Sequence, residues 1–210
     1  MDDPHHPDLP WPLEGADPLR DELLAAYDDA ARGYHDRGHL IAVLRRLREL
    51  AAAGERYDAL PVQLAAWFHD AVYDGERDAE ERSACWAEDA LPGLLDRGGI
   101  AEVARLVRLT ETHSPAADDR NGAALSDADL GILATDTATY DAYAAAVREE
   151  YRHLTDEEFV TGRVAVLRDL AERDDLFRTA YARDRWADAA RANMQRELAF
   201  WGAAAPVGAR

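Results

Sequence analysis

A histidine and an aspartate stand side by side, at His69 and Asp70, inside the most apolar run of the chain, residues 64–73. A buried imidazole or carboxylate must be hydrogen-bonded, ion-paired or bound to a metal ion, because leaving it without a partner is costly. Neighbouring positions of a helix point about 100° apart, so both side chains can reach one cation at the flank of a helix. The pair predicts a metal site whose other ligands come from elsewhere in the chain.

Two further side chains are candidates for the same ion. His39 stands beside an apolar stripe that begins at Leu40, and Asp129 is a later carboxylate. Two imidazoles and two carboxylates would hold one divalent transition metal, with positions left for water and substrate. Ser126 precedes Asp129 by three residues, however, and this S-x-x-D spacing is also that of a helix capping box. From spacing alone, Asp129 is either a metal ligand or a capping residue.

The elements that carry these residues are predicted to be helices. Apolar residues recur with helical spacing, and even the runs that contain Val and Ile keep it, so we expect an all-α fold, a single-domain helical bundle. Thr155 and Glu158 form a capping box at the start of one helix, and Pro92 could kink another. The expected helices cover residues 18–32, 39–50, 61–73, 76–97, 100–112, 126–135, 137–154, 157–173 and 184–201.

The remaining segments are expected at the termini. Residues 1–16 are rich in proline, which suits an extended N-terminal tail or a strap over the domain surface. The helical domain is expected to span residues 17–202, followed by a short C-terminal tail over residues 203–210. A chain of 210 residues with 48% hydrophobic and 31% charged residues is large enough for one globular domain with a sizeable core.

Charge and cysteine content restrict the partners. The formal net charge of −18 argues against a nucleic-acid polymer, since proteins that bind one usually carry a basic face. Cys85 is the only cysteine, which excludes an intrachain disulfide and fits a reducing compartment. We see no signal peptide and no run of roughly 20 apolar residues that could span a bilayer. We therefore expect a cytoplasmic protein without a membrane partner; association into a homo-oligomer stays open.

The order His39, His69-Asp70, Asp129 resembles the signature of the HD-domain superfamily of metal-dependent phosphohydrolases. In that superfamily these four residues bind the metal, so the resemblance favours Asp129 as a ligand and implies a helical bundle of HD-domain type. The chain is also similar to an uncharacterised subgroup of predicted HD phosphohydrolases. The matching blocks are Tyr34-His35, residues 67–73, Glu81 with Ser83-Ala84, Thr112-His113, residues 127–130, Arg148 with Tyr151, Gly162-Arg163, Arg191 with Asn193, and Glu197-Leu198.

Further roles follow from this resemblance and from residue chemistry. Asp70 and Glu81 are the expected catalytic carboxylates, because Glu81 follows the His-Asp pair closely enough to fold back over the metal as a general acid or base. A solvated helix face is the alternative for Glu81, and surface ion pairs are the alternative for the arginines that could hold phosphate. The expected substrate-binding residues are His35, His113, Arg148 and Arg163.

These residues predict hydrolysis of a small phosphorylated molecule, such as a nucleotide, by a water that one divalent transition metal ion activates. Imidazole and carboxylate ligands accept Mn, Fe, Co, Ni or Zn, so the identity of the metal stays open. Two other functions stay open. One is a non-catalytic regulatory domain that binds metal or nucleotide; the other, less favoured, is a di-iron HD-type oxygenase, which needs more histidines between Asp70 and Asp129 than His113 alone.

Overall fold

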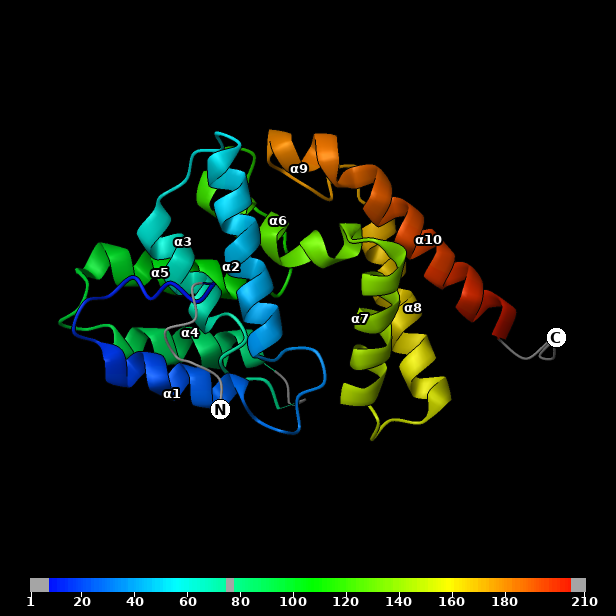
Figure 1. Cartoon of the computed structure of the whole chain (residues 1–210), viewed down its shortest axis with the longest axis horizontal. Helices are drawn as coiled ribbons and strands as arrows, with labels where there is room; N and C mark the ends of the chain where they lie inside the picture. Colours follow the sequence, from blue (N-terminus) through cyan, green and yellow to red (C-terminus); the bar gives the residue numbers. More distant parts are fainter. Residues whose placement is uncertain (1–7, 75–77, 205–210) are drawn as a thin grey trace.

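The computed structural model describes residues 8–74 and 78–204, and over these ranges the chain forms helices and no strand, as predicted (Figure 1). None of the helices in these ranges combines the length and apolar character needed to cross a bilayer. The elements are α1 (Asp17–Tyr27), α2 (Arg37–Ala52), α3 (Ala59–Phe68), α4 (Ala79–Ala90), α5 (Arg97–Leu109), α6 (Arg120–Leu130), the 3-10 turn η1 (Gly131–Ala134), α7 (Thr137–Glu150), α8 (Asp156–Glu172), α9 (Ala180–Arg185) and α10 (Ala187–Ala204).

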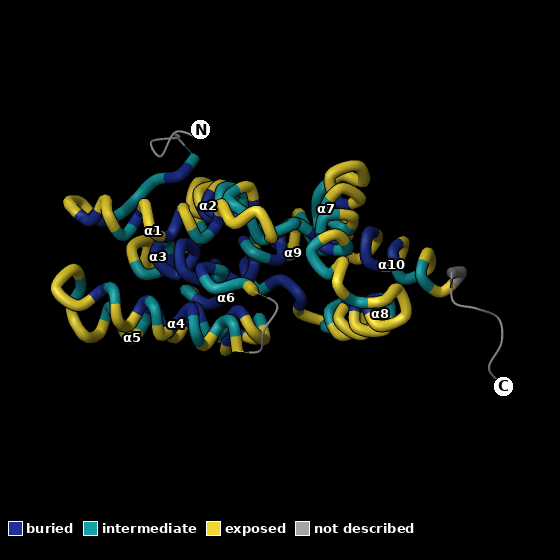
Figure 2. The backbone as a smooth tube through the Cα atoms, turned by 90° about the horizontal axis from the view of Figure 1, so that it is seen from below, coloured by how far each residue is buried: buried dark blue, intermediate teal, exposed yellow. Residues whose placement is uncertain are grey.

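The helices gather in two groups (Figure 1). The helices α1 to α6 form the larger group, in which α3 packs against α2, α5 and α6, and α4 packs along α5. The second group contains α7, α8 and α10, and α10 packs against both η1 and α8. Figure 2 shows that buried residues concentrate over α3 and α6, whereas α5 and α8 present exposed faces. The helices α3 and α6 therefore form the interior that positions the predicted metal ligands.

The start of α2 is determined by its cap and its apolar stripe. The Asp36 carboxylate accepts hydrogen bonds from the backbone N–H groups of Gly38 and His39, at 2.8 and 3.2 Å. Such a cap satisfies amides that have no partner inside the helix. The stripe that follows is buried at every expected position: Leu40, Val43, Leu44, Leu47 and Leu50. His39 is thereby held in the first turn of α2, facing the interior.

The helix α3 ends at Phe68, so the prediction of a helix that continues to Tyr73 is wrong. His69 and Ala71 still donate their backbone N–H groups to α3 carbonyls, of Ala65 at 2.8 Å and of Phe68 at 2.9 Å, but the amides of Asp70 and Val72 find partners outside the helix. Asp70 donates its N–H to the Tyr27 hydroxyl at 3.3 Å, and Val72 donates its N–H to Ser83 Oγ at 3.0 Å. Tertiary contacts thus replace the helical ladder, and the His-Asp pair lies in a turn.

The described part of the N-terminal segment, residues 8–16, is a strap that packs into the core rather than a free tail. Leu9 and Leu13 are buried in the hydrophobic cluster. The indole N–H of Trp67 donates to the Pro10 carbonyl at 3.2 Å, and the ring of Trp11 meets Trp67 edge to face at 5.0 Å. Residues 1–7 of the predicted tail lie outside the described residues, as do residues 205–210.

Other helix boundaries differ from those predicted, and prolines and caps explain most differences. The fourth helix ends at Ala90, just before Pro92, so it stops where a kink was expected; its expected start at residues 76 and 77 lies outside the described residues. The Asp96 carboxylate caps α5 through the Gly99 N–H at 2.7 Å, which starts α5 three residues early. The structure has two helices, α9 and α10, where one last helix was predicted. The first helix, α1, ends at Tyr27 and not at residue 32. The capping box of Thr155 is confirmed.

Candidate metal centre

Four side chains from three segments converge inside the larger group of helices. His39 comes from the first turn of α2, His69 and Asp70 from the turn after α3, and Asp129 from the last turn of α6. The Nε2 atoms of His39 and His69 lie 3.1 Å apart. Asp70 Oδ2 lies 3.2 Å from His39 Nε2 and 3.0 Å from His69 Nε2. Asp129 Oδ1 lies 3.1 and 3.7 Å from the same two nitrogens, so the structure brings all four predicted ligands together.

The outer nitrogen of each imidazole is engaged, which leaves Nε2 directed at the centre. His69 Nδ1 lies 2.9 Å from the Ala66 carbonyl; a carbonyl only accepts, so Nδ1 carries the proton and Nε2 keeps its lone pair in the neutral ring. His39 Nδ1 lies 2.9 Å from the Tyr34 hydroxyl. Metal-binding histidines commonly hold their outer N–H in this way, because it determines tautomer and ring orientation.

The four groups require positive charge between them. Burial alone lowers the pKa of His39 and His69, which are 3% and 1% exposed, but the carboxylates of Asp129 and Asp70 outweigh it and raise both. Conversely, burial opposes ionisation of the two carboxyl groups, and the neighbouring imidazoles hold their pKa values well below the usual range. Two nitrogens and two oxygens aimed at one point are a donor set that fits a divalent transition metal.

The position of Asp129 in α6 excludes the capping interpretation. The cap of α6 is Asp119, whose carboxylate accepts the Gly122 N–H at 2.8 Å, and the helix begins at Arg120. Asp129 lies at the opposite end, in the last turn, where the helix dipole disfavours a negative charge. Asp129 is therefore directed at two histidines and does not cap the helix.

Glu150 is a supporting residue that the sequence analysis did not identify. Its Oε1 accepts the backbone N–H groups of Gly33, Tyr34 and His35 at 3.1, 3.3 and 3.2 Å. A Cβ at Gly33 would lie 2.5 Å from the Ala146 carbonyl oxygen, so only glycine lets this loop approach α7 so closely. Glu150 therefore anchors the loop whose Tyr34 hydroxyl orients His39.

Arg32 is a second supporting residue outside the predicted set. Its guanidinium donates to the backbone carbonyls of His35 and Asp70, both at 2.7 Å, and of Ala71 at 2.9 Å. It thus joins the turn that carries the His-Asp pair to the loop before α2. Neither Arg32 nor Glu150 has a recognisable sequence signal, because most of their partners are backbone groups that any residue type would supply.

The predicted substrate-binding histidines both lie beside the centre. His113 Nε2 lies 2.8 Å from Asp129 Oδ2, and the backbone of His113 is left-handed, with a φ of 49°. The ring of His35 stacks on Tyr73 with a centroid distance of 4.0 Å, and its Nδ1 lies 2.7 Å from Glu150 Oε2. His113 is therefore one hydrogen bond away from a candidate ligand.

The structure does not bring Glu81 or Arg148 to the centre. The Glu81 side chain is 52% exposed and accepts two hydrogen bonds from Arg108, at 2.6 and 2.7 Å. Arg148 donates to the Tyr151 carbonyl at 2.9 Å and to Asp156 Oδ1 at 2.7 Å. Glu81 and Arg148 thus form ion pairs away from the centre, as the alternative of a solvated helix face and surface ion pairs predicted.

Arg163 lines the space beside the centre, but its guanidinium is already engaged. It donates to both carboxylate oxygens of Glu197, at 2.8 and 2.9 Å, and to the Tyr143 hydroxyl at 2.9 Å. The bidentate geometry expected for a phosphate is thus used within the chain. Arg163 and Glu197 are both buried, so their pairing joins α8 to α10.

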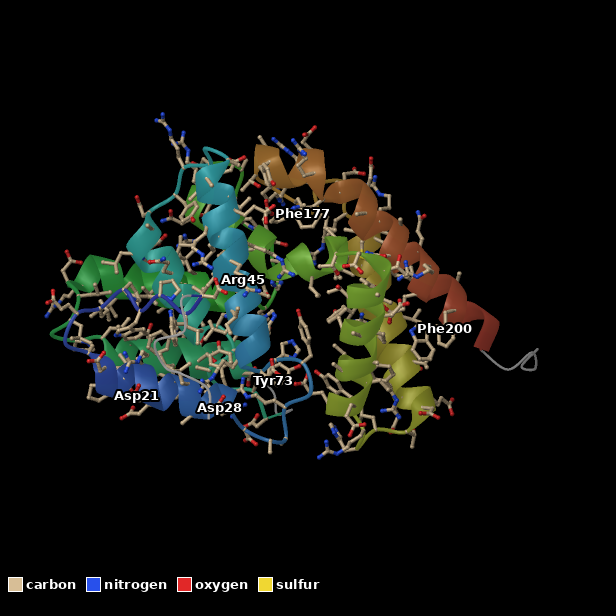
Figure 3. All side chains as sticks on the ribbon, viewed as in Figure 1. Asp21, Asp28, Arg45, Tyr73, Phe177 and Phe200 are labelled. Carbon is tan, nitrogen blue, oxygen red and sulfur yellow. The ribbon has the colours of Figure 1, made fainter. Side chains whose placement is uncertain are left out.

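A pocket of about 650 Å³ opens beside the candidate metal centre and is lined from both groups of helices. His35, His39, His113 and Asp129 contribute its polar wall. Figure 3 labels Tyr73, another lining residue, on the side of α2 that faces α7. Much of the remaining lining is apolar or aromatic and includes Leu130, Ile132, Leu133, Tyr143, Val147, Tyr151, Leu154, Phe159, Val166 and Leu170.

Comparison of the chain with protein-family models, with curated proteins and with solved structures finds no match. Fold and site by themselves define the class: an all-helical protein with a cluster of two buried histidines and two partly buried aspartates, open to a pocket of small-molecule size. His39, His69 and Asp70 each offer an atom within 4.8 Å of the other two, which is a distance that one ion can bridge.

Proposed function

We propose that this chain is a metal-dependent phosphohydrolase of the HD-domain type that cleaves a small phosphate monoester. The observation that carries the proposal is the convergence of the imidazoles of His39 and His69 with the carboxylates of Asp70 and Asp129. The order of these residues along the chain also resembles the superfamily signature. A divalent ion at such a cluster supplies Lewis-acid chemistry, polarising phosphoryl oxygens and making water a stronger nucleophile near neutral pH.

His113 is the chain's best-placed proton-transfer group. It lines the pocket, and its Nε2 is hydrogen-bonded to Asp129, which orients the ring. Its other ring nitrogen has no hydrogen bond from residues 8–74 or 78–204 and is available to exchange a proton with a leaving-group oxygen. Histidine is the side chain most often used as a general acid or base. His113 therefore takes the role that the sequence analysis assigned to Glu81.

The pocket lining favours a substrate with one phosphoryl group and an apolar or aromatic organic part. Two arginines line it, and both are engaged: Arg163 by Glu197, and Arg173 by Asp169 and the Thr112 carbonyl at 2.5 and 2.8 Å. A polyphosphate chain would need several free cationic groups. A pocket of about 650 Å³ with apolar walls is in the range typical for small organic ligands. Aromatic and alkyl monophosphates, including nucleoside monophosphates, fit this description best.

Phosphate release from a substrate panel tests the proposal. Purified protein loaded with Mn, Fe, Co, Ni or Zn is assayed against aryl phosphates, alkyl phosphates, nucleoside monophosphates and nucleoside triphosphates. We expect turnover of monophosphates with at least one metal, loss of turnover in His69→Ala, and unchanged turnover in His153→Ala, which changes an exposed histidine. Absence of phosphate release across the whole panel would overturn the proposal. Two iron atoms per chain would favour the oxygenase instead.

A further inference from the structure

A second pocket, of about 620 Å³, lies at the other end of α2, and we propose that it binds a small multiply charged anion through an arginine cluster. Its walls come from the loop after α2, the segment before α6 and the start of α9. The C-terminal end of α2 and the helix α9 lie near each other at the top of Figure 1. The arginine cluster consists of Arg56, Arg120, Arg178 and Arg183.

Within the described part of the chain, the guanidinium groups of the arginine cluster have no partners. Across residues 8–74 and 78–204, none of the four makes a side-chain hydrogen bond or an ion pair, and the buried Nε of Arg178 has no acceptor. The chain has 42 acidic and 24 basic residues, all of the latter arginine, so a carboxylate is easily found for each. Four unpaired like charges around one pocket repel each other, and a bound anion would relieve that repulsion.

The three carboxylates of the same pocket neutralise the arginine cluster only in part. Glu55 is held by the backbone N–H of Tyr181, at 2.7 Å from its Oε1. Asp119 is held by Arg105, which lies outside the pocket lining, at 2.7 and 3.1 Å. Of the three lining carboxylates, only Asp175 has no such partner among the described residues. With four arginines against three carboxylates, one of which is also paired with Arg105, the pocket lining keeps a net positive charge in a strongly acidic protein.

The wall that carries Arg178 is preformed. The buried carboxylate of Asp127 accepts the backbone N–H groups of Arg178 and Thr179, at 2.8 and 2.7 Å, and so ties this segment to α6. On the opposite wall, the Tyr57 hydroxyl donates to the Leu47 carbonyl at 2.7 Å. Binding to a preformed pocket does not require the protein backbone to become ordered, so the entropic cost of that ordering does not weaken binding.

The chemistry of the arginine cluster points to linked phosphoryl groups. Guanidinium binds phosphate oxygens in bidentate fashion, and four of them can serve two or more phosphoryl groups at once. The pocket is also separate from the candidate metal centre. His39 lies in the first turn of α2, and the arginine cluster begins after the last turn, about 20 Å further along the helix. The anion site therefore does not depend on the proposed hydrolase activity.

Calorimetric titration of the full chain with inorganic tripolyphosphate tests this inference. The titration is run at low salt with a chelator present, because screening weakens exposed charge interactions and metal would compete for the ligand. We expect saturable binding that the double variant Arg56→Gln/Arg120→Gln weakens about tenfold or more. The matched control is Arg97→Gln/Arg168→Gln. It removes two exposed arginines that also lack a side-chain partner among the described residues but lie outside the pocket.

The outcomes separate clearly. Binding that is retained in the control pair and in Asp70→Asn, but weakened in the pocket pair, places the anion at the arginine cluster and not at the metal centre. Equal weakening in both arginine pairs would mean that only overall charge matters, and it would overturn the inference. Failure of the wild-type protein to bind tripolyphosphate at roughly millimolar concentration, about −4 kcal/mol of binding free energy, would also overturn it. All four substituted arginines are exposed, so the variants keep the fold.

Discussion

His113 Nε2 and Asp129 Oδ2 are joined by a hydrogen bond of 2.8 Å, while the other oxygen of the same carboxylate lies 3.1 Å from His39 Nε2. Asp129 thus connects the candidate metal centre to a histidine in the pocket. A carboxylate that serves a metal with one oxygen and orients an imidazole with the other would couple the two functions. Each can be tested separately.

Substitution of His113 discriminates between the two candidate general acid–base groups. We expect His113→Gln to lower kcat by about 10²–10⁴-fold, the usual contribution of such a group, with metal content unchanged. Glu81→Gln should leave kcat within about twofold, because the Glu81 side chain is exposed and paired with Arg108. Steady-state kinetics on the best monophosphate substrate check both. The opposite pattern would return the catalytic role to Glu81.

Metal binding should stabilise the fold. An ion that binds only the native state raises the free energy of unfolding by about 2.7 kcal/mol when its free concentration is 100 times Kd. For a domain of this size, that corresponds to a Tm rise of roughly 5–10 °C. Calorimetric melting with and without chelator measures the shift. Asp129→Asn should reduce or abolish it, whereas Asp141→Asn, an exposed position on α7, should retain it. A full shift in Asp129→Asn would remove this residue from the ligand set.

Loss of the Glu150 carboxylate should destabilise the loop before α2. Glu150→Ala leaves three backbone N–H groups and His35 Nδ1 without their acceptor, and we expect a loss of about 1–3 kcal/mol in the free energy of unfolding. The neighbouring Glu149→Ala changes an exposed side chain and should cost less than about 0.5 kcal/mol. Urea unfolding of the two variants provides the comparison; equal losses would contradict the anchoring role.

The buried pair of Arg163 and Glu197 should make stability dependent on pH in the acid range. Burial opposes ionisation of Glu197, but hydrogen bonds and charge from Arg163, with hydrogen bonds from Tyr140 and Trp201, outweigh it and lower the Glu197 pKa below 4.5. Between the lowered and the ordinary pKa the unfolded chain binds more protons, so stability is present above about pH 4.5 and falls as the solution is acidified below it.

Urea unfolding between pH 7 and pH 3 measures this dependence. Glu197→Gln removes the titrating group, so its stability should be lower than wild type at pH 7 and should fall less steeply below pH 4.5. The exposed substitution Glu157→Gln on α8 serves as the control and should keep the wild-type slope. Identical slopes in wild type and Glu197→Gln would show that other carboxyl groups dominate acid unfolding.

Local pattern was sufficient to locate most helices, though not all of their ends, and to select three of the four candidate ligands. The apolar stripe of α2 and the capping box at Thr155 depend on residues within one or two turns, and both occur as predicted. His39, His69 and Asp70 could be selected because histidine and aspartate in apolar surroundings need a partner. The choice of Asp129 required the superfamily resemblance, since spacing alone also allowed a helix cap.

Contacts between segments that are distant in sequence decided where α3 ends, where Glu81 lies and what surrounds the candidate metal centre. The helix α3 stops at Phe68 because the Tyr27 hydroxyl and Ser83 Oγ take up the amides of the turn, and neither partner is near in sequence. Glu81 is drawn to Arg108 because α4 packs along α5, and not because of any signal in its own segment. The sequence by itself determined an all-helical chain with a histidine–aspartate pair in need of polar or charged partners. Tertiary packing alone decided that His113 and the apolar pocket lie beside this pair, because side-chain chemistry is local whereas the meeting of segments depends on the whole core.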